Sequence, residues 1–209
     1  MKAQRSIFRL FVSSTFSDMA QERRILHERV FPQLKKLCQS KEGDFQVVDL
    51  RWGVNEESQK DHKTMAICLG EISRCQQHTP KPNFLILLGD RYGWEPIPAE
   101  IVSTEFEELL NVATLEEKET LNEWYLEDNN ASPPEYYLKR REGEFEEYED
   151  WEKVESKLRE ILRRLVNAAN LDEVSQAKYF QSATHQEIVN GALLKPEFLD
   201  NDILNYFYF

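Results

Sequence analysis

Residues 7–15 read Ile-Phe-Arg-Leu-Phe-Val-Ser-Ser-Thr, a short apolar and aromatic run that stops at three hydroxyl residues. A run of this kind, bounded by polar turn residues, is typical of a buried β-strand. Two further runs, at residues 45–50 and 83–89, have the same character. The sequence therefore predicts three strands. The third is continuously apolar, as a central parallel strand buried on both faces is expected to be.

Segments of helical length separate these strands. Apolar residues recur at close to helical spacing from residue 19 to about 39, and again over residues 62–77. Because strand, helix and strand in this order give parallel pairing, we expect an α/β fold with a parallel sheet and flanking helices. A further helix at about 182–194 and a fourth strand at 204–209 are also predicted. Because the sequence stops inside that strand, we expect it to be the front part of a longer protein.

The negative charge lies in one segment. The net charge is -12, yet residues 95–160 contain 21 acidic and 7 basic residues, which leaves the remainder at +2. Binding to a phosphate backbone requires clustered Lys and Arg, so no nucleic-acid partner is expected. Residues 96–180 are predicted to form an acidic helical insertion, with helices near 98–110, 114–126 and 146–169 and no strong strand. Its Glu-rich faces are either solvated surface or a docking surface for a basic protein partner.

Several classes of protein are disfavoured by the sequence. No apolar run approaches the roughly 20 residues of a membrane span, and no secretory signal is present, so we expect a cytoplasmic protein. The three cysteines form no C-x-x-C pair, which favours free thiols and gives no metal site. Neither a dinucleotide glycine fingerprint nor a P-loop occurs, so no standard cofactor is expected.

Candidate binding residues follow the predicted strands, because ligands of open parallel sheets bind outside the carboxyl ends of the strands. They are Ser13, Ser14, Thr15 and Phe16 after the first strand, Asp49, Arg51 and Trp52 after the second, and Arg91, Tyr92 and Trp94 after the third. Hydroxyl, guanidinium and aromatic groups suit the ribose, phosphate and base of a nucleotide. The alternative is that these residues serve turns, helix caps and local ion pairs, such as Arg51 or Arg91 with Asp49 or Asp90.

Five motifs in order carry a resemblance to a known family. They are FVSSTFSDM at 11–19 with Glu22-Arg23, VDLRWGV at 48–54, CLGEI at 68–72, LGDRYGW at 88–94 and SATHQEI at 182–188. Together they resemble the TIR-related domain catalogued as domain of unknown function 4062. This domain occurs at the front of NACHT and WD-repeat proteins, including the telomerase-associated and nephrocystin types, and of STAND-type proteins. The resemblance covers residues 5–94 and 181–209 and leaves the insertion unmatched.

The resemblance implies a flavodoxin-like fold related to TIR domains, some of which cleave NAD at the nicotinamide–ribose bond with a glutamate. The matching position here is Glu187, which would be the catalytic residue. The tryptophan that often precedes this glutamate by one turn is replaced by Ala183. Thr184 and Glu187 also fit a capping box, in which Glu187 would only bind the start of its helix. Glu71 is a weaker rival, because its helix precedes the third strand.

Two main hypotheses of function follow. In the first, the chain is an N-terminal effector or signalling domain of a STAND protein of the NACHT type. It would bind NAD as a substrate and hydrolyse it after self-association through a downstream module. In the second, it is a non-catalytic adaptor that makes homotypic contacts. A third and weaker hypothesis is a hydrolase of another nucleoside. The expected organisation is a TIR-like part at 1–95, the insertion at 96–180 and the last helix and strand at 181–209.

Overall fold

The computed structural model describes residues 7–15, 18–50, 56–79 and 82–194. The chain divides into two compact units, each built from separate stretches of sequence. The first, which we call the parallel-sheet unit, comprises Met1–Val54, Met65–Trp94 and Ser182–Phe209. The second, the insertion unit, comprises Asn55–Thr64 and Glu95–Gln181. The predicted strand at 204–209 and its neighbours lie outside the described residues.

The parallel-sheet unit contains the three strands that the sequence predicts. They are β1 (Ile7–Ser14), β2 (Asp44–Val48) and β3 (Phe84–Leu87), in the order β2-β1-β3. Both pairings are parallel, and Phe11 of β1 is opposite Val48 on one side and Phe84 on the other. The α/β fold class is thus confirmed, and the order is consistent with a flavodoxin-like sheet.

The middle strand among the three described strands is β1. The predicted fourth strand lies outside the described residues, so the expectation that the third strand is central stays a prediction. The last five residues of β1 are all buried, whereas all four of β3 are only partly buried. The chain passes from β2 across β1 to reach β3, and this crossover places the first strand in the middle. Apolar continuity alone did not distinguish the two strands, because both are rich in Leu and Phe.

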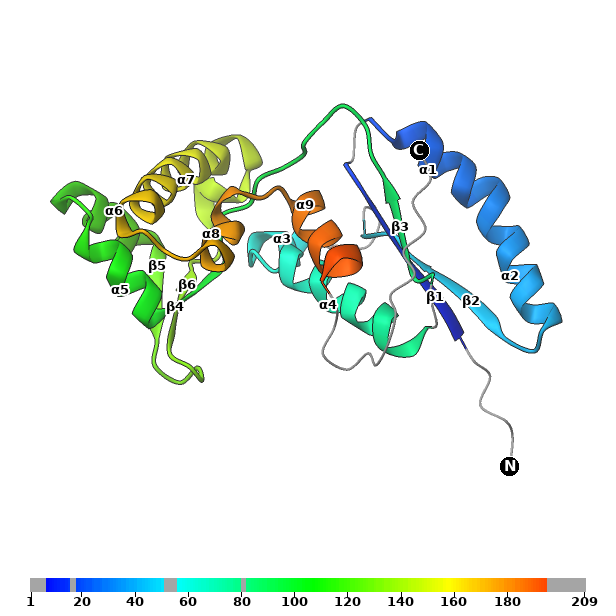
Figure 1. Ribbon diagram of the computed structural model, residues 1–209. Helices are drawn as coiled ribbons and strands as arrows, with labels where there is room; N and C mark the ends of the chain where they lie inside the picture. The colour runs from blue at the N-terminus through cyan, green and yellow to red at the C-terminus, as the bar shows by residue number, and fades with distance from the viewer. Residues whose placement is uncertain (1–6, 16–17, 51–55, 80–81, 195–209) are drawn as a thin grey trace. The chain divides into compact units, whose positions relative to one another are not determined.

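Helices cover both faces of this sheet (Figure 1). One face carries a continuous helical stretch of α1 (Ala20–Ile25), the π-helical turn η1 (Leu26–Val30) and α2 (Phe31–Ser40). The other carries α4 (Thr64–His78), α9 (Ala183–Ile188) and the π-helical turn η4 (Val189–Leu193). Successive side chains of a strand point to opposite faces. Accordingly, Leu10 and Val12 pack with Phe31, while Phe11 packs with Ile72.

The insertion unit is a sheet packed against helices, so the expectation that residues 96–180 form a helical insertion without a strong strand is wrong with respect to the strands. Its strands β4 (Glu100–Val102), β5 (Tyr125–Asp128) and β6 (Glu135–Leu138) pair antiparallel in the order β4-β6-β5. Its helices are α5 (Ser103–Asn111), α6 (Leu115–Trp124), α7 (Tyr148–Ala169) and α8 (Glu173–Phe180), with the 3-10 turn η3 (Gly143–Glu146). The sequence did not predict these strands because they have only three or four residues. In addition, β4 and β5 each adjoin a helix without a break.

The core of the insertion unit is apolar and continuous. Phe106 of α5 and Leu158 and Leu165 of α7 are completely buried in it. Thr114 and Glu117 form a capping box at the start of α6. Among the described residues, no helix combines the length and the apolar character that a membrane span requires.

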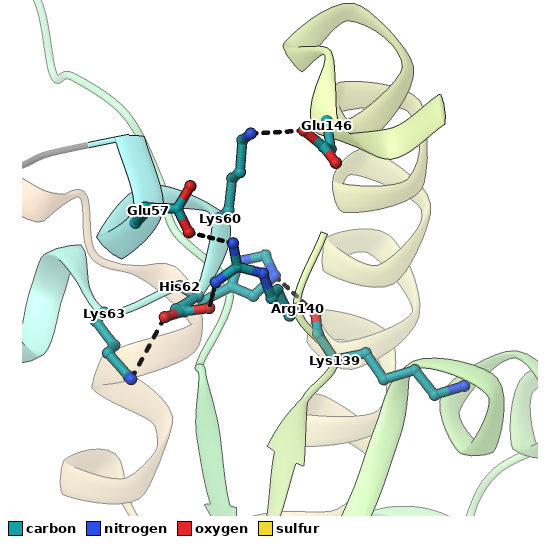
Figure 2. A network of polar contacts seen from close by, with 8 residues as sticks. Glu57, Lys60, His62, Lys63, Lys139, Arg140 and Glu146 are labelled. Carbon is teal, nitrogen blue, oxygen red and sulfur yellow. Dashed lines mark hydrogen bonds and ion pairs between the residues drawn. The ribbon is translucent and has the colours of Figure 1, made fainter. Parts of the chain in front are cut away.

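The short helix α3 (Glu56–Lys60), which follows β2 in sequence, belongs to the insertion unit. Figure 2 shows how it is held: Arg140 forms ion pairs with Glu57 and Asp61, and Lys60 Nζ lies 2.6 Å from Glu146 Oε2. His62 Nε2 donates to the carbonyl oxygen of Lys139 at 3.0 Å. Burial lowers the pKa of His62 to about 4, so this ring is neutral at physiological pH. Residues 56–64 therefore fold with the insertion unit. From the sequence, the helix at 62–77 was expected to belong to the TIR-like part at 1–95.

Two helical glycines provide a test of this packing. A Cβ added at Gly191 would lie 2.6 Å from Cδ2 of Phe84, whereas one added at Gly70 would meet nothing within 4 Å. We expect Gly191→Ala to lower the free energy of unfolding by about 1–3 kcal/mol, because η4 must move away from β3. Gly70→Ala should raise it by about 0.5–1 kcal/mol, through helix propensity. Urea denaturation measures both, and effects of the same sign would contradict the contact between η4 and Phe84.

Candidate functional site

Glu187 lies at the carboxyl end of the central strand. Helix α9 begins after Ser182, whose hydroxyl accepts a hydrogen bond from the backbone N–H of His185 at 3.2 Å. The capping-box interpretation of Thr184 and Glu187 is therefore wrong, because Ser182 is the residue that caps this helix. The Glu187 carboxylate instead accepts a hydrogen bond from Ser13 Oγ at 2.5 Å. A carboxylate from the last described helix thus reaches the end of β1.

The surroundings of Glu187 favour its neutral form. Its side chain is buried, with the residue only 8% exposed, and this desolvation raises the pKa of the carboxyl. Hydrogen bonds from Ser13 and Cys68 and the positive charge of Arg23 act in the opposite direction without cancelling the effect. Burial, followed by the charge of Glu187, raises the pKa of the Cys68 thiol, so this thiol stays protonated as a donor. Glu187 therefore titrates above the range of an ordinary glutamate.

A buried ion pair lies on the opposite side of the same strand end. The guanidinium of Arg23 pairs with Asp49, which follows β2, and the two side chains are 4% and 2% exposed. Arg23 Nε also donates to Ser14 Oγ at 2.6 Å, and Arg23 Nη2 donates to the Ser14 carbonyl oxygen at 3.3 Å. His27 Nε2 donates to the second oxygen of Asp49 at 3.0 Å. Arg23 thus joins the helical stretch to the ends of β1 and β2.

Asp18 connects the loops that follow β1 and β3. Its carboxylate accepts hydrogen bonds from Thr15 Oγ1 and, at 3.1 Å, from the backbone N–H of Arg91. The hydrogen bond from Thr15, then that from Arg91, lowers the pKa of Asp18, so the group is ionised at neutral pH. Nearby, Gly93 has a φ of +96°, which favours glycine, and a Cβ there would lie 3.0 Å from Thr15 Cγ2. The two loops are therefore in close contact.

Exposed aromatic side chains follow β3. The Tyr92 hydroxyl and His185 Nδ1 are 2.8 Å apart, and their rings meet edge to face. The Trp94 carbonyl oxygen accepts a hydrogen bond from the backbone N–H of Ala183 at 2.8 Å, which joins this loop to the start of α9. Tyr92 is 52% exposed and Trp94 is 42% exposed. Large apolar rings are thus accessible to a ligand or a partner beside the helix that carries Glu187.

The structure brings together part of the set predicted from sequence. Ser13, Ser14, Thr15 and Asp49 gather at the ends of β1 and β2, and Arg91, Tyr92 and Trp94 lie in the loop after β3. Phe16, Arg51 and Trp52 lie outside the described residues. The Asp49 carboxylate accepts hydrogen bonds from Arg23 and His27. In this structure it therefore forms a structural ion pair and does not face a nucleotide.

Glu71, the rival of Glu187, has other partners. It lies on α4 and pairs with Arg9 Nη2 at 2.7 Å and with Arg74. Arg9 is at the third position of β1, away from the carboxyl end of the strand. Glu71 is therefore not part of the cluster around Ser13.

Four residues of the cluster were missed by the sequence analysis as site residues: Asp18, Arg23, His27 and Cys68. Arg23 and His27 are four positions apart in one helical stretch, and this spacing puts both on the same side of a helix. That signal is present in the sequence but is common on solvated helices, so it does not identify a buried pair. Cys68 appeared only as a core thiol.

The family profile described as "Domain of unknown function (DUF4062)" matches residues 9–189, which include residues of both units. The chain belongs to the DUF4062 family. The resemblance drawn from the five motifs is thereby confirmed, and the insertion, which those motifs left unmatched, lies within the family match.

The relatives of this DUF4062 domain are much longer proteins. NACHT and WD repeat domain-containing protein 2 of Mus musculus is 30% identical over 218 residues, covering 94% of this chain and 12% of that protein. NACHT domain- and WD repeat-containing protein 1 of Mus musculus is 37% identical over 122 residues, which is 57% of this chain and 8% of that protein. Telomerase protein component 1 of Rattus norvegicus is 39% identical over 88 residues, 42% of this chain and 3% of that protein. No solved structure matches the chain significantly.

The buried ion pair leads to a prediction of stability. Asp49→Asn leaves the Arg23 guanidinium buried without its counter-charge, so we expect the free energy of unfolding to fall by about 3–5 kcal/mol. The matched control is Glu28→Gln, which removes a carboxylate from the exposed ion pair with Arg24, where the side chains are 56% and 75% exposed. That change should have a much smaller effect, because solvent screens an exposed ion pair. Denaturant titration measures both, and a small effect at Asp49 would contradict the buried pair.

The burial of Glu187 predicts a pH dependence. Because its pKa in the folded chain is raised above 4.5, the stability contributed by the neutral carboxyl is present below pH 4.5. It is lost as the pH rises through the folded-state pKa. Glu187→Gln does not ionise, so we expect its unfolding midpoint at pH 8 to exceed that of the unmodified chain by about 2–4 °C. The two midpoints should converge near pH 4.

The control for this experiment is Glu71→Gln, which removes the carboxylate from the ion pair with Arg9. Glu71→Gln should lower the midpoint at pH 8, because it breaks a partly buried pair. Thermal unfolding followed by circular dichroism across pH 4–8 measures all three proteins. Destabilisation by Glu187→Gln at pH 8 would show that the native state depends on an ionised carboxylate at this position.

Proposed function

We propose that this DUF4062 domain is the N-terminal effector domain of a NACHT-type signalling protein, and that it binds NAD and hydrolyses it when assembled. The wider assignment rests on its relatives, whose names include NACHT and WD repeat domains. The enzymatic part rests on one observation, the Glu187 carboxylate hydrogen-bonded to Ser13 at the carboxyl end of β1. Self-association would come from a downstream module, which is part of the proposal.

The position of Glu187 in the sheet supports a ligand site. In the order β2-β1-β3, one connection from β1 leads to β2 on one side, and the next returns across β1 to β3. The helices of these two connections lie on opposite faces of the sheet (Figure 1). The loops therefore diverge between β1 and β3, and open α/β sheets bind ligands at such a switch point. Ser13 and Glu187 lie at this point.

The chemistry proposed for Glu187 is stabilisation of a positive charge. The bond between the nicotinamide nitrogen and ribose C1′ breaks, and the electron pair leaves with the neutral nicotinamide. The ribose becomes an oxocarbenium-like cation, which an adjacent carboxylate stabilises. Water then adds at C1′ and releases a proton, so the products are nicotinamide, ADP-ribose and a proton. The carboxylate must be ionised for this role. Burial raises its pKa, and the Ser13 hydrogen bond and the Arg23 charge act in the opposite direction.

The residues around Glu187 suggest how the rest of NAD would be held. The accessible rings of Tyr92 and Trp94 suit stacking with a base, and the exposed Arg91 side chain suits a phosphate. Ser14 and Asp49 do not contribute in this scheme, because both are bonded to Arg23. Binding would then rest on the loop after β3, with Ser13 beside the ribose.

The enzymatic proposal is tested with the chain held at high local density. The chain is attached through a terminal tag to lipid vesicles, incubated with NAD, and nicotinamide and ADP-ribose are measured by chromatography. We expect equimolar release of both, and a loss of at least about 100-fold in rate for Glu187→Gln. Glu71→Gln is the matched control and should retain the rate, because it changes a glutamate of the same unit outside the cluster.

Three results bear against hydrolysis of NAD by Glu187. Absence of nicotinamide release from the clustered chain, or equal rates for Glu187→Gln and the unmodified chain, removes the assignment. Release of a base from another nucleoside, without turnover of NAD, would instead support the hypothesis that the chain is a nucleoside hydrolase. Thermal unfolding of each variant checks that a lost rate does not reflect a lost fold.

A non-catalytic adaptor is the second candidate, and a different observation favours it. Leu88, Tyr92 and Trp94 follow β3 and are 70%, 52% and 42% exposed, which is a concentration of apolar side chains typical of contact surfaces. An adaptor would use this stretch for homotypic association. Leu88→Asp should then abolish self-association in sedimentation experiments, whereas Glu187→Gln should leave it unchanged.

A further inference from the structure

The antiparallel sheet of the insertion unit has one covered and one uncovered face. Ile101, Tyr125 and Leu138 point toward the helices and are buried, and the partly buried Tyr136 stacks on Phe106 of α5 with ring centroids 4.1 Å apart. The side chains that alternate with them point away. Three of these are apolar yet accessible: Val102 and Leu126 are each 36% exposed, and Tyr137 is 40% exposed. One face of a half-buried sheet is normally polar, so these side chains are unusual.

Strand register arranges this uncovered side in two rows that cross all three strands. In the first row, Tyr137 of β6 is opposite Glu100 of β4 and Leu126 of β5. In the second row, Glu135 of β6 is opposite Val102 of β4 and Asp128 of β5. We call these residues the outer face. They are three apolar and three acidic residues: Val102, Leu126, Tyr137, Glu100, Asp128 and Glu135.

The acidic residues of the outer face lie in an unfavourable arrangement. Glu135 and Asp128 are direct cross-strand neighbours, and like charges in this position destabilise a sheet. Partial burial and then the charges of Glu100 and Asp128 raise the pKa of Glu135. In the described part of the chain, no ion pair neutralises any of the three carboxylates, whereas Glu105 and Glu117 of the same unit pair with Lys178 and Arg164. Without a partner, these three carboxylates therefore repel one another on a partly apolar surface.

We propose that the outer face is the docking surface for a basic amphipathic helix of a partner protein. The apolar stripe of that helix packs on Val102, Leu126 and Tyr137, and its Lys or Arg side chains pair with the three carboxylates. This arrangement removes the accessible apolar area and the like-charge repulsion together. The inference is independent of NAD binding, because it concerns a different unit of the chain.

The dimensions of the face suit a helix. Three strands span about 10 Å from edge to edge, and strands of three or four residues are about 10–13 Å long. This area matches the width of one helix and about two of its turns. Such a contact is small, so we expect a dissociation constant in the micromolar range.

Other occupants fit the outer face less well. A nucleic acid would be repelled by the carboxylates. A second copy of this chain is disfavoured by its net charge of -12. Among the described residues, no group of acidic side chains has the geometry to hold a metal ion. Charge complementarity therefore selects a basic protein segment.

The probe is a synthetic helical peptide of 18 residues with a leucine stripe and lysines on its flanks. The control peptide has the same leucines with glutamate in place of lysine. We expect the basic peptide to shift the amide NMR signals of Glu100–Val102, Tyr125–Asp128 and Glu135–Leu138 in the full chain. Its dissociation constant should be on the order of 10–100 μM and should rise with salt. The acidic peptide should not bind.

Two matched variants separate this face from general attraction to an acidic protein. Glu135→Lys should weaken peptide binding at least 10-fold. It should also raise the unfolding midpoint by about 1–3 °C, because it replaces a like-charge pair by an attractive one. Glu119→Lys makes the same charge change on the exposed side of α6 and should alter affinity less than 3-fold. The increase in midpoint shows that loss of binding by Glu135→Lys does not come from unfolding.

The outcomes that overturn the proposal are equally specific. NMR shifts that spread over α6 and α7 as strongly as over the three strands would show unspecific attraction, as would equal losses for the two variants. Binding of the acidic peptide would show that charge has no part in the contact. A dimer in sedimentation experiments that Glu135→Lys dissociates would make a second copy the occupant and reject the basic helix.

Discussion

The buried ion pair between Arg23 and Asp49 is the contact on which the parallel-sheet unit depends. A guanidinium and a carboxylate that are almost fully buried tolerate the loss of water only when each satisfies the other. Here Arg23 also donates to the hydroxyl and the carbonyl group of Ser14. One side chain therefore fixes the ends of two neighbouring strands against the helical stretch that connects them.

This constraint extends to the other face of the sheet because Ser13 and Ser14 are consecutive residues of β1. Their side chains point in opposite directions, so Ser14 contacts Arg23 while Ser13 contacts Glu187 on α9. The charge of Arg23 still reaches Glu187 and lowers its pKa against the larger effect of burial. The protonation of the candidate catalytic carboxyl is thus set partly from the far side of the strand. Burial and a nearby positive charge shift the pKa of a carboxyl in opposite directions, so small changes in structure can alter its charge state.

The sequence predicted the parallel sheet, its helices and the cluster at the strand ends, because hydrophobic periodicity and strand order determine those features. It did not predict that Ser182 caps α9, since the choice between Ser182 and Thr184 depends on where the chain turns. It did not place Asp49 in an ion pair with Arg23, because the two are 26 residues apart and meet only through tertiary packing. The sheet of the insertion was missed for a local reason: strands as short as Glu100–Val102 give no period-two signal of their own.

The insertion unit is made from two stretches of chain, so one excision cannot remove it from the domain. Helix α3 and His62 lie between β2 and α4 in sequence but belong to the unit that resumes after Trp94. Excision of the long acidic stretch alone would remove Arg140 and Glu146 and leave Glu57 and Lys60 without their partners. The remaining chain would carry an orphaned segment directly before α4. A minimal parallel-sheet protein therefore requires two replacement linkers, one in place of the α3 segment and one in place of the long acidic stretch.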